Sequence, residues 1–142
     1  MRIGELAKRA NCDIETIRFY EKSGMLNAPG RNSNGYRAYQ AEHLECLQFI
    51  RHCRSLQIGL SEIRVLLDLK SNRSAGCQSV DDLLDRHIGR VREQMATLKL
   101  LEQQLVALRE QCQGPHSIDE CGILQNLTEA TERHECACHD TA

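Results

Sequence analysis

The first 26 residues place apolar side chains at the three- and four-residue spacing of two short helices. In the first stretch Ile3, Leu6 and Ala10 share one face. Asp13 is a good N-cap for the second stretch, and Gly24 is a typical residue to end it. Because a helix-turn-helix consists of two such helices across a tight break, the pattern predicts this motif.

The next segment, RNSNGYRAY at residues 31–39, has the composition of a small basic hairpin. Asn34-Gly35 is a strong turn signal, Tyr39 favours a strand, and Arg31 and Arg37 flank the turn. A hairpin in this place predicts a wing beside the helix-turn-helix. The spacing of Leu and Ile then predicts two further helices, over 41–55 and 60–70.

The longest apolar pattern runs over residues 80–112 with a spacing of four and then three residues. It is held for more than four heptads, which predicts a two-stranded coiled coil about 50 Å long. Since one helix cannot bury such a seam alone, we expect a homodimer. The two stripes of the seam are Val80, His87, Gln94, Leu101, Leu108 and Leu84, Val91, Leu98, Leu105, Cys112.

The heptad pattern also predicts that three cysteines come together in a dimer. Cys77 lies one heptad before Leu84, on the stripe that ends at Cys112. In an antiparallel dimer Cys77 of one chain would lie beside Cys112 of the other, and a turn at Gly114-Pro115 would return Cys121 to the same point. The sequence therefore predicts a three-sulfur site at each end of the coil. The alternative is that Cys112 fills the coil and Cys121 packs in a core.

Three thiolates favour soft or borderline ions, here Pb(II), Cd(II), Zn(II) or Hg(II). A second, looser metal site is expected in the last residues, where the alternative is a tail with incidental donors; its candidate ligands are His134, Cys136, Cys138 and His139. We interpret Cys12, Cys46 and Cys53 as packing residues.

Composition supports an organisation in parts. The chain has 142 residues and a net charge of −2; residues 1–73 carry 12 basic and 8 acidic side chains, and residues 74–142 carry 6 and 12. A basic front half suggests a polyanion-binding module. No signal peptide or membrane span is expected, which predicts a cytoplasmic protein with reduced thiols. The expected parts are a DNA-binding domain (1–72), a hinge (73–79), a dimerisation helix (80–112), a metal-binding loop and short helix (113–131), and a flexible Cys/His tail (132–142).

The segment IGELAKRANCDIETIRFYEKSGML, the NGYRAY wing, RHCRSLQIGLSEI and the long helix resemble the MerR family of metal-responsive transcription regulators. Cys77, the spacing of Cys112 and Cys121, and the CxC near the end resemble its lead- and cadmium-responsive branch (PbrR and CadR types). The resemblance implies a mainly α fold with a winged helix-turn-helix domain, a long antiparallel coiled-coil helix and a short C-terminal metal loop.

The same resemblance implies a mechanism and its partners. The dimer would bind a palindromic promoter, repress without metal, and activate with metal by distorting the DNA for RNA polymerase. Implied DNA contacts, to base edges or to the phosphate backbone, are Thr16, Arg18, Tyr20, Arg31, Tyr36, Arg37 and Arg54.

Other functions account for less of the sequence. A thiol/disulfide redox sensor on the same fold is the main alternative, and it would not need Cys77. A small-molecule regulator would need a larger domain after the coil, and a metal-storage role would leave the helix-turn-helix unexplained. No nucleophile–base pair or phosphate loop is visible, so an enzyme is not expected.

Overall fold

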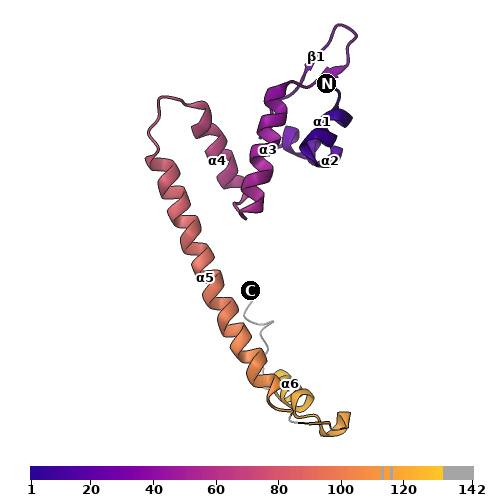
Figure 1. The fold of residues 1–142 in the computed structure, drawn as a ribbon, viewed down its shortest axis with the longest axis vertical. Coiled ribbons are helices and arrows are strands. Elements are labelled where there is room, and N and C mark those ends of the chain that lie inside the picture. The colour runs from indigo at the N-terminus through magenta and orange to yellow at the C-terminus, as the bar shows by residue number, and fades with distance from the viewer. Residues whose placement is uncertain (113, 116, 133–142) are drawn as a thin grey trace. The chain divides into compact units, whose positions relative to one another are not determined.

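The computed structural model describes residues 1–112, 114–115 and 117–132. Within these residues the chain forms six α-helices, one 3-10 helix and one two-stranded sheet (Figure 1). The prediction of a mainly α fold is confirmed. The chain divides into two units, Met1–His87 and Ile88 onwards, and each is described by itself.

The first two helices form the expected pair. Helix α1 (Ile3–Ala10) is followed by Asn11 as its C-cap, whose left-handed backbone (φ 53°) lets its N–H bond to the carbonyls of Ala7 and Lys8. Helix α2 (Ile14–Lys22) follows after Asp13, and Gly24 (φ 79°) turns the chain away from its end. A positive φ at this turn suits glycine, which has no Cβ to clash.

The wing is a hairpin of two very short antiparallel strands, β1 (Gly30–Arg31) and β2 (Arg37–Ala38). The Asn32 side chain organises the loop, because its Oδ1 accepts from the N–H of Asn34 (3.0 Å) and of Tyr36 (3.1 Å). After β2 the Tyr39 N–H donates to the Met1 carbonyl (2.8 Å), which ties the wing to the start of α1.

Helices α3 (Ala41–Ser55) and α4 (Leu60–Ser71) complete the amino-terminal unit, and α3 contacts both α1 and α4. Two core clusters hold these elements together, and burial of their apolar side chains is the main stabilising term. The first core cluster is Leu6, Ala7, Ala10, Ile17, Leu26, Tyr39 and Leu47; the second is Met25, Ile50, Cys53, Ile58 and Ile63.

Helix α5 (Gln78–Arg109) is continuous over 32 residues. The heptads predicted a helix over residues 80–112. The observed helix begins two residues before that start and ends three residues before that end. Cys112 therefore lies beyond the helix, where the Arg109 guanidinium donates to the Cys112 carbonyl (3.0 Å) and holds the following turn. Near its start Leu83 is buried, and His87 Nε2 lies 2.9 Å from the Leu56 carbonyl oxygen.

After α5 come a 3-10 helix (Ile118–Glu120) and helix α6 (Gly122–Glu132). The expected tail site, with His134, Cys136, Cys138 and His139, lies outside the described residues. Among the described helices none has both the length and the apolar character needed to cross a bilayer.

Candidate functional site

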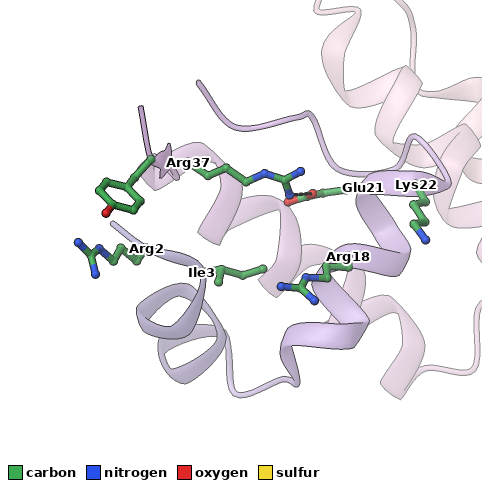
Figure 2. Close-up of a pocket in the computed structure, with 7 residues that line it drawn as sticks. Arg2, Ile3, Arg18, Glu21, Lys22 and Arg37 are labelled. Carbon is green, nitrogen blue, oxygen red and sulfur yellow. Dashed lines mark hydrogen bonds and ion pairs between the residues drawn. The ribbon is translucent and has the colours of Figure 1, made fainter. Parts of the chain in front are cut away.

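A basic cleft lies between the start of α1, helix α2 and the wing (Figure 2). Its volume is about 460 Å³, and its lining contains four cationic side chains against one carboxylate. Such a surface suits the phosphate backbone of a nucleic acid. The residues that line this basic cleft are Arg2, Ile3, Arg18, Glu21, Lys22, Tyr36 and Arg37.

Glu21 connects helix α2 to the wing from within this cleft. Its carboxylate accepts from Arg37 Nη1 (3.3 Å) and from the Tyr39 hydroxyl (2.5 Å), and Figure 2 shows Arg37 extended toward it. Burial and the neighbouring Glu21 carboxylate raise the pKa of Tyr39, which keeps the hydroxyl protonated as a donor. The network fixes where Arg37 is presented, because two partners converge on one carboxylate.

Arg2 supports the tip of the wing. Its guanidinium lies 4.9 Å from the centre of the Tyr36 ring, a cation–π contact. Arg31 Nη1 donates to the Gly35 carbonyl (3.3 Å) within the same hairpin. Tyr36 keeps more than half of its surface exposed, so it stays available to a ligand.

The remaining predicted DNA contacts differ in accessibility. Arg18 is exposed and lines the basic cleft, whereas Thr16 is half-buried. Tyr20 packs against both core clusters, which gives it a structural part as well. Arg54 is exposed and donates to the Ile58 carbonyl (3.1 Å).

Sequence reasoning missed Arg2, Glu21 and Lys22 as members of the cleft. Lys22 follows Arg18 by one helical turn, a spacing that places both on one face and that the sequence already showed. Glu21 pairs with a residue 16 positions away, so no local pattern pointed to it.

Cys77 lies just before the first residue of α5 and its side chain is exposed. It borders an apolar groove of about 270 Å³ in the amino-terminal unit. One wall carries a cation–π contact, with Lys70 Nζ 4.9 Å from the Phe49 ring centre. The residues that line this groove are Phe49, Leu66, Leu69, Lys70, Ala75, Gly76, Cys77 and Val80.

Cys112 and Cys121 lie at the two ends of one loop in the second unit, and both are half-buried. The Cys112 thiol lies 3.5 Å from the Gly114 carbonyl oxygen. Cys121 precedes α6, and its carbonyl accepts the Gln125 N–H (3.1 Å) in the first turn of that helix. Within the described part of a single chain, no three His, Cys, Asp or Glu side chains are grouped as a metal site.

The other described cysteines have the environment of packing residues. Burial raises the pKa of the thiols of Cys12, Cys46 and Cys53. Cys46 also donates to the Met25 carbonyl (3.5 Å). Because the thiolate is the form that binds metal, this chemistry disfavours them as ligands.

Helix α5 presents a long exposed apolar surface. Leu98 is 62% exposed and Met95 64% exposed. Ile88 and Met95 were not in the predicted stripes, yet with Leu84, Val91 and Leu98 they continue the four-and-three spacing beside His87 and Gln94. The exposed apolar surface is thus broader than the predicted seam, and it consists of Leu84, Ile88, Val91, Met95, Leu98, Leu101 and Leu105.

Two family models match the chain in succession. The model of the MerR HTH family regulatory proteins covers residues 1–70, and the MerR DNA-binding model covers residues 44–108. The chain belongs to the MerR family. MerR proteins of this kind are DNA-binding regulators, so the expectation that the chain is not an enzyme is confirmed.

Individual MerR proteins are similar over most of the chain. The HTH-type transcriptional regulator ZntR homolog of Haemophilus influenzae is 43% identical over 110 residues, 78% of this chain and 82% of that protein. The mercuric resistance operon regulatory protein of Bacillus cereus is 35% identical, over 89% of this chain and 96% of that protein. The crystal structure of the transcription regulator PbrR691 from Ralstonia metallidurans, in complex with lead(II), superimposes with a TM-score of 0.81; it is 46% identical and matches 89% of this chain and 98% of that one.

Proposed function

We propose that this MerR protein senses a soft divalent metal ion and controls genes for heavy-metal resistance. The main support for this proposal is the similarity of the chain, over 89% of its length, to a regulator crystallised with lead(II). Pb(II) and Cd(II) are the first candidates as effector. Zn(II) and Hg(II) remain candidates because the chain also resembles a ZntR homolog and a mercuric resistance regulator. The protein would act in the cytoplasm, where promoter DNA and reduced thiols are both present.

The proposed metal ligands are Cys112, Cys121 and Cys77 of the partner subunit. Cys112 and Cys121 lie on one short loop, and Cys77 is exposed at the start of α5. A helix of 32 residues is about 48 Å long, so an antiparallel dimer along α5 would bring the start of one helix to the end of the other. Three thiolates fit the preference of lead, cadmium, zinc and mercury for soft donors.

The dimer itself is supported by the exposed apolar surface of α5. Residues such as Leu98 and Met95 are more than half exposed in the single chain. A contiguous apolar surface of this length on a helix favours pairing with a second copy.

The proposed mechanism is distortion of promoter DNA. The basic cleft and the wing would hold a palindromic promoter, with phosphate contacts setting the position and α2 reading base edges. Without metal the dimer represses, and with metal it bends the promoter into a form that RNA polymerase uses. DNA deformation costs about 1–6 kcal/mol, and the ion supplies this only if it binds the activating conformation more tightly.

A second metal site is proposed in the tail, with His134, Cys136, Cys138 and His139 as ligands. Its support is compositional: four soft donors occur within six consecutive positions.

The decisive experiment uses single Cys→Ser variants at 77, 112 and 121. Each should lose thiolate–lead charge-transfer absorbance and metal-induced transcription, while promoter binding is kept. A mixed dimer of one Cys77→Ser chain and one Cys112→Ser chain should retain one complete site. Normal lead binding by Cys77→Ser would refute the shared site. A response to oxidants without metal, independent of Cys77, would favour the thiol/disulfide alternative.

A further inference from the structure

The residues that flank the two loop cysteines touch each other. Gln111 precedes Cys112, and Gly122 follows Cys121 as the first residue of α6. A Cβ added to Gly122 would lie 2.6 Å from the Gln111 carbonyl oxygen and 3.5 Å from its carbonyl carbon. Cβ atoms in proteins do not come within 3.0 Å of such an atom, and a backbone carbonyl cannot rotate away as a side chain does.

This close approach distinguishes Gly122 from the other glycines. All nine glycines of the chain lie in its described part, and at each of the others an added Cβ would meet no atom closer than 3.8 Å. At Gly24, Gly35 and Gly114 a positive φ accounts for the residue. At Gly122 the backbone has no positive φ, so the reason for glycine is space.

We infer that Gly122 is a positioning residue for the Cys112–Cys121 pair: its missing side chain lets the loop close at its base. The inference rests on the proposed metal-sensing function. Neighbouring contacts fix each side of the closure. The Arg109 guanidinium holds the Cys112 carbonyl (3.0 Å), and the Gln125 side chain donates to the Asp119 carbonyl (3.3 Å).

The physical consequence is preorganisation of two of the three sulfur ligands. With the loop closed, the backbones at Cys112 and Cys121 are held near one another before any ion arrives. The loop is then already ordered in the metal-free protein, so the entropic cost of ordering it does not weaken metal binding. A methyl group at position 122 would push α6 away from the end of α5 and separate the two cysteines.

The test is Gly122→Ala in the full-length dimer, with Gly89→Ala as the matched control. Gly89 lies within α5 with no atom within 4 Å of an added Cβ, and it is outside the seam. We expect Gly122→Ala to lower the affinity for Pb(II) by about 10- to 100-fold, the range seen when groups that orient metal ligands are changed. Gly122→Ser carries the same Cβ and should behave alike. Promoter binding and helical circular dichroism should be unchanged, which shows that the variants fold.

A second measurement does not involve metal. Diamide oxidises two thiols to a disulfide and takes up both hydrogens to become the hydrazine. The rate of disulfide formation therefore reports how often the two sulfur atoms meet. The Cys112–Cys121 disulfide, mapped by mass spectrometry in the metal-free dimer, should form at least about tenfold more slowly in Gly122→Ala than in Gly89→Ala.

Lead affinity and disulfide rate together test the metal-sensing function and the role of Gly122 separately. If the unmodified dimer binds none of Pb(II), Cd(II), Zn(II) and Hg(II), the proposed function fails, and the disulfide rates still decide whether Gly122 closes the loop. If the dimer binds lead and Gly122→Ala matches Gly89→Ala in both affinity and disulfide rate, the role of Gly122 is refuted while the metal site stands. If Gly122→Ala forms the disulfide at the control rate but loses lead affinity, loop closure is also refuted.

Discussion

Burial divides the described cysteines into two chemical groups. Cys53 is only 6% exposed and Cys46 is half-buried with its S–H bonded to a carbonyl, whereas Cys77 is exposed at the start of a helix. Cys46 and Cys53, which we interpret as packing residues, lie seven positions apart on α3. The raised pKa values of both thiols agree with that interpretation.

This division predicts unequal alkylation. A thiol whose pKa is raised carries less thiolate at pH 8, and each unit of pKa lowers the thiolate fraction about tenfold. Cys46 and Cys53 should therefore react with iodoacetamide at least about tenfold more slowly than the exposed Cys77, and their rates should keep rising with pH beyond the usual range of a cysteine thiol. Timed quenching and peptide mass spectrometry give the rates; equal rates for Cys46 and Cys77 would contradict the assignment.

At the scale of residues, local signals were predictable and long-range ones were not. Gly24 and Asn34-Gly35 act within their own turns, so the sequence showed them directly. Glu21 meets Arg37 and Tyr39, 16 and 18 positions later, only because the wing folds back onto α2. The space requirement at Gly122 is equally tertiary, since it depends on where Gln111 lies.

At the scale of elements, the exposed apolar surface of α5 offers an internal comparison. Leu98 and Leu100 are the same residue type in the same helix, 62% and 61% exposed. Two positions correspond to about 200° around a helix, so Leu100 faces away from the surface that contains Leu98.

This comparison predicts that Leu98→Asp dissociates the dimer and Leu100→Asp does not. A carboxylate at Leu98 would be buried in the pair without a partner, which costs several kcal/mol, whereas at Leu100 it stays in water. Sedimentation velocity of the two variants measures the difference. Dissociation by both variants equally would mean that the pairing surface is not the one described.

The bounds of α5 show what heptads predict and what they do not. Heptad spacing located the helix to within three residues at each end. It did not show that Ile88 and Met95 are exposed beside the polar positions His87 and Gln94. The contact of His87 with the Leu56 carbonyl was also hidden, because it joins residues 31 positions apart.

At the scale of the whole molecule, the proposed metal site would be shared between subunits and would therefore couple metal binding to dimerisation. An ion that binds only the dimer must stabilise the dimer by the same free energy, by linkage. Motif order predicted the MerR family from the sequence alone. Lead, cadmium, zinc and mercury all accept the same sulfur donors, so a titration of the dimer with each ion decides among them.

The coupling is measurable as subunit exchange. When donor- and acceptor-labelled dimers are mixed, Pb(II) should slow the growth of energy transfer by about 5- to 150-fold, the range of typical coupling energies. Cys112→Ser dimers should exchange at one rate with or without lead. If the rate of subunit exchange of the unmodified protein is the same with and without Pb(II), the metal site lies within one chain.

The open apolar surface of α5 also bears on how a cell keeps related regulators separate. A bacterium that makes several proteins with this fold makes several long helices with similar stripes, and any two could pair into a hybrid that answers to the wrong signal. What discriminates among them is the arrangement of less favourable positions within the stripe. His87 and Gln94 are such positions, and Arg90 and Glu93 lie beside Gln94 and Leu98. A polar residue that meets an apolar one is penalised, while a copy that meets itself is not. The irregularity of the helix surface would then protect the fidelity of a regulatory circuit.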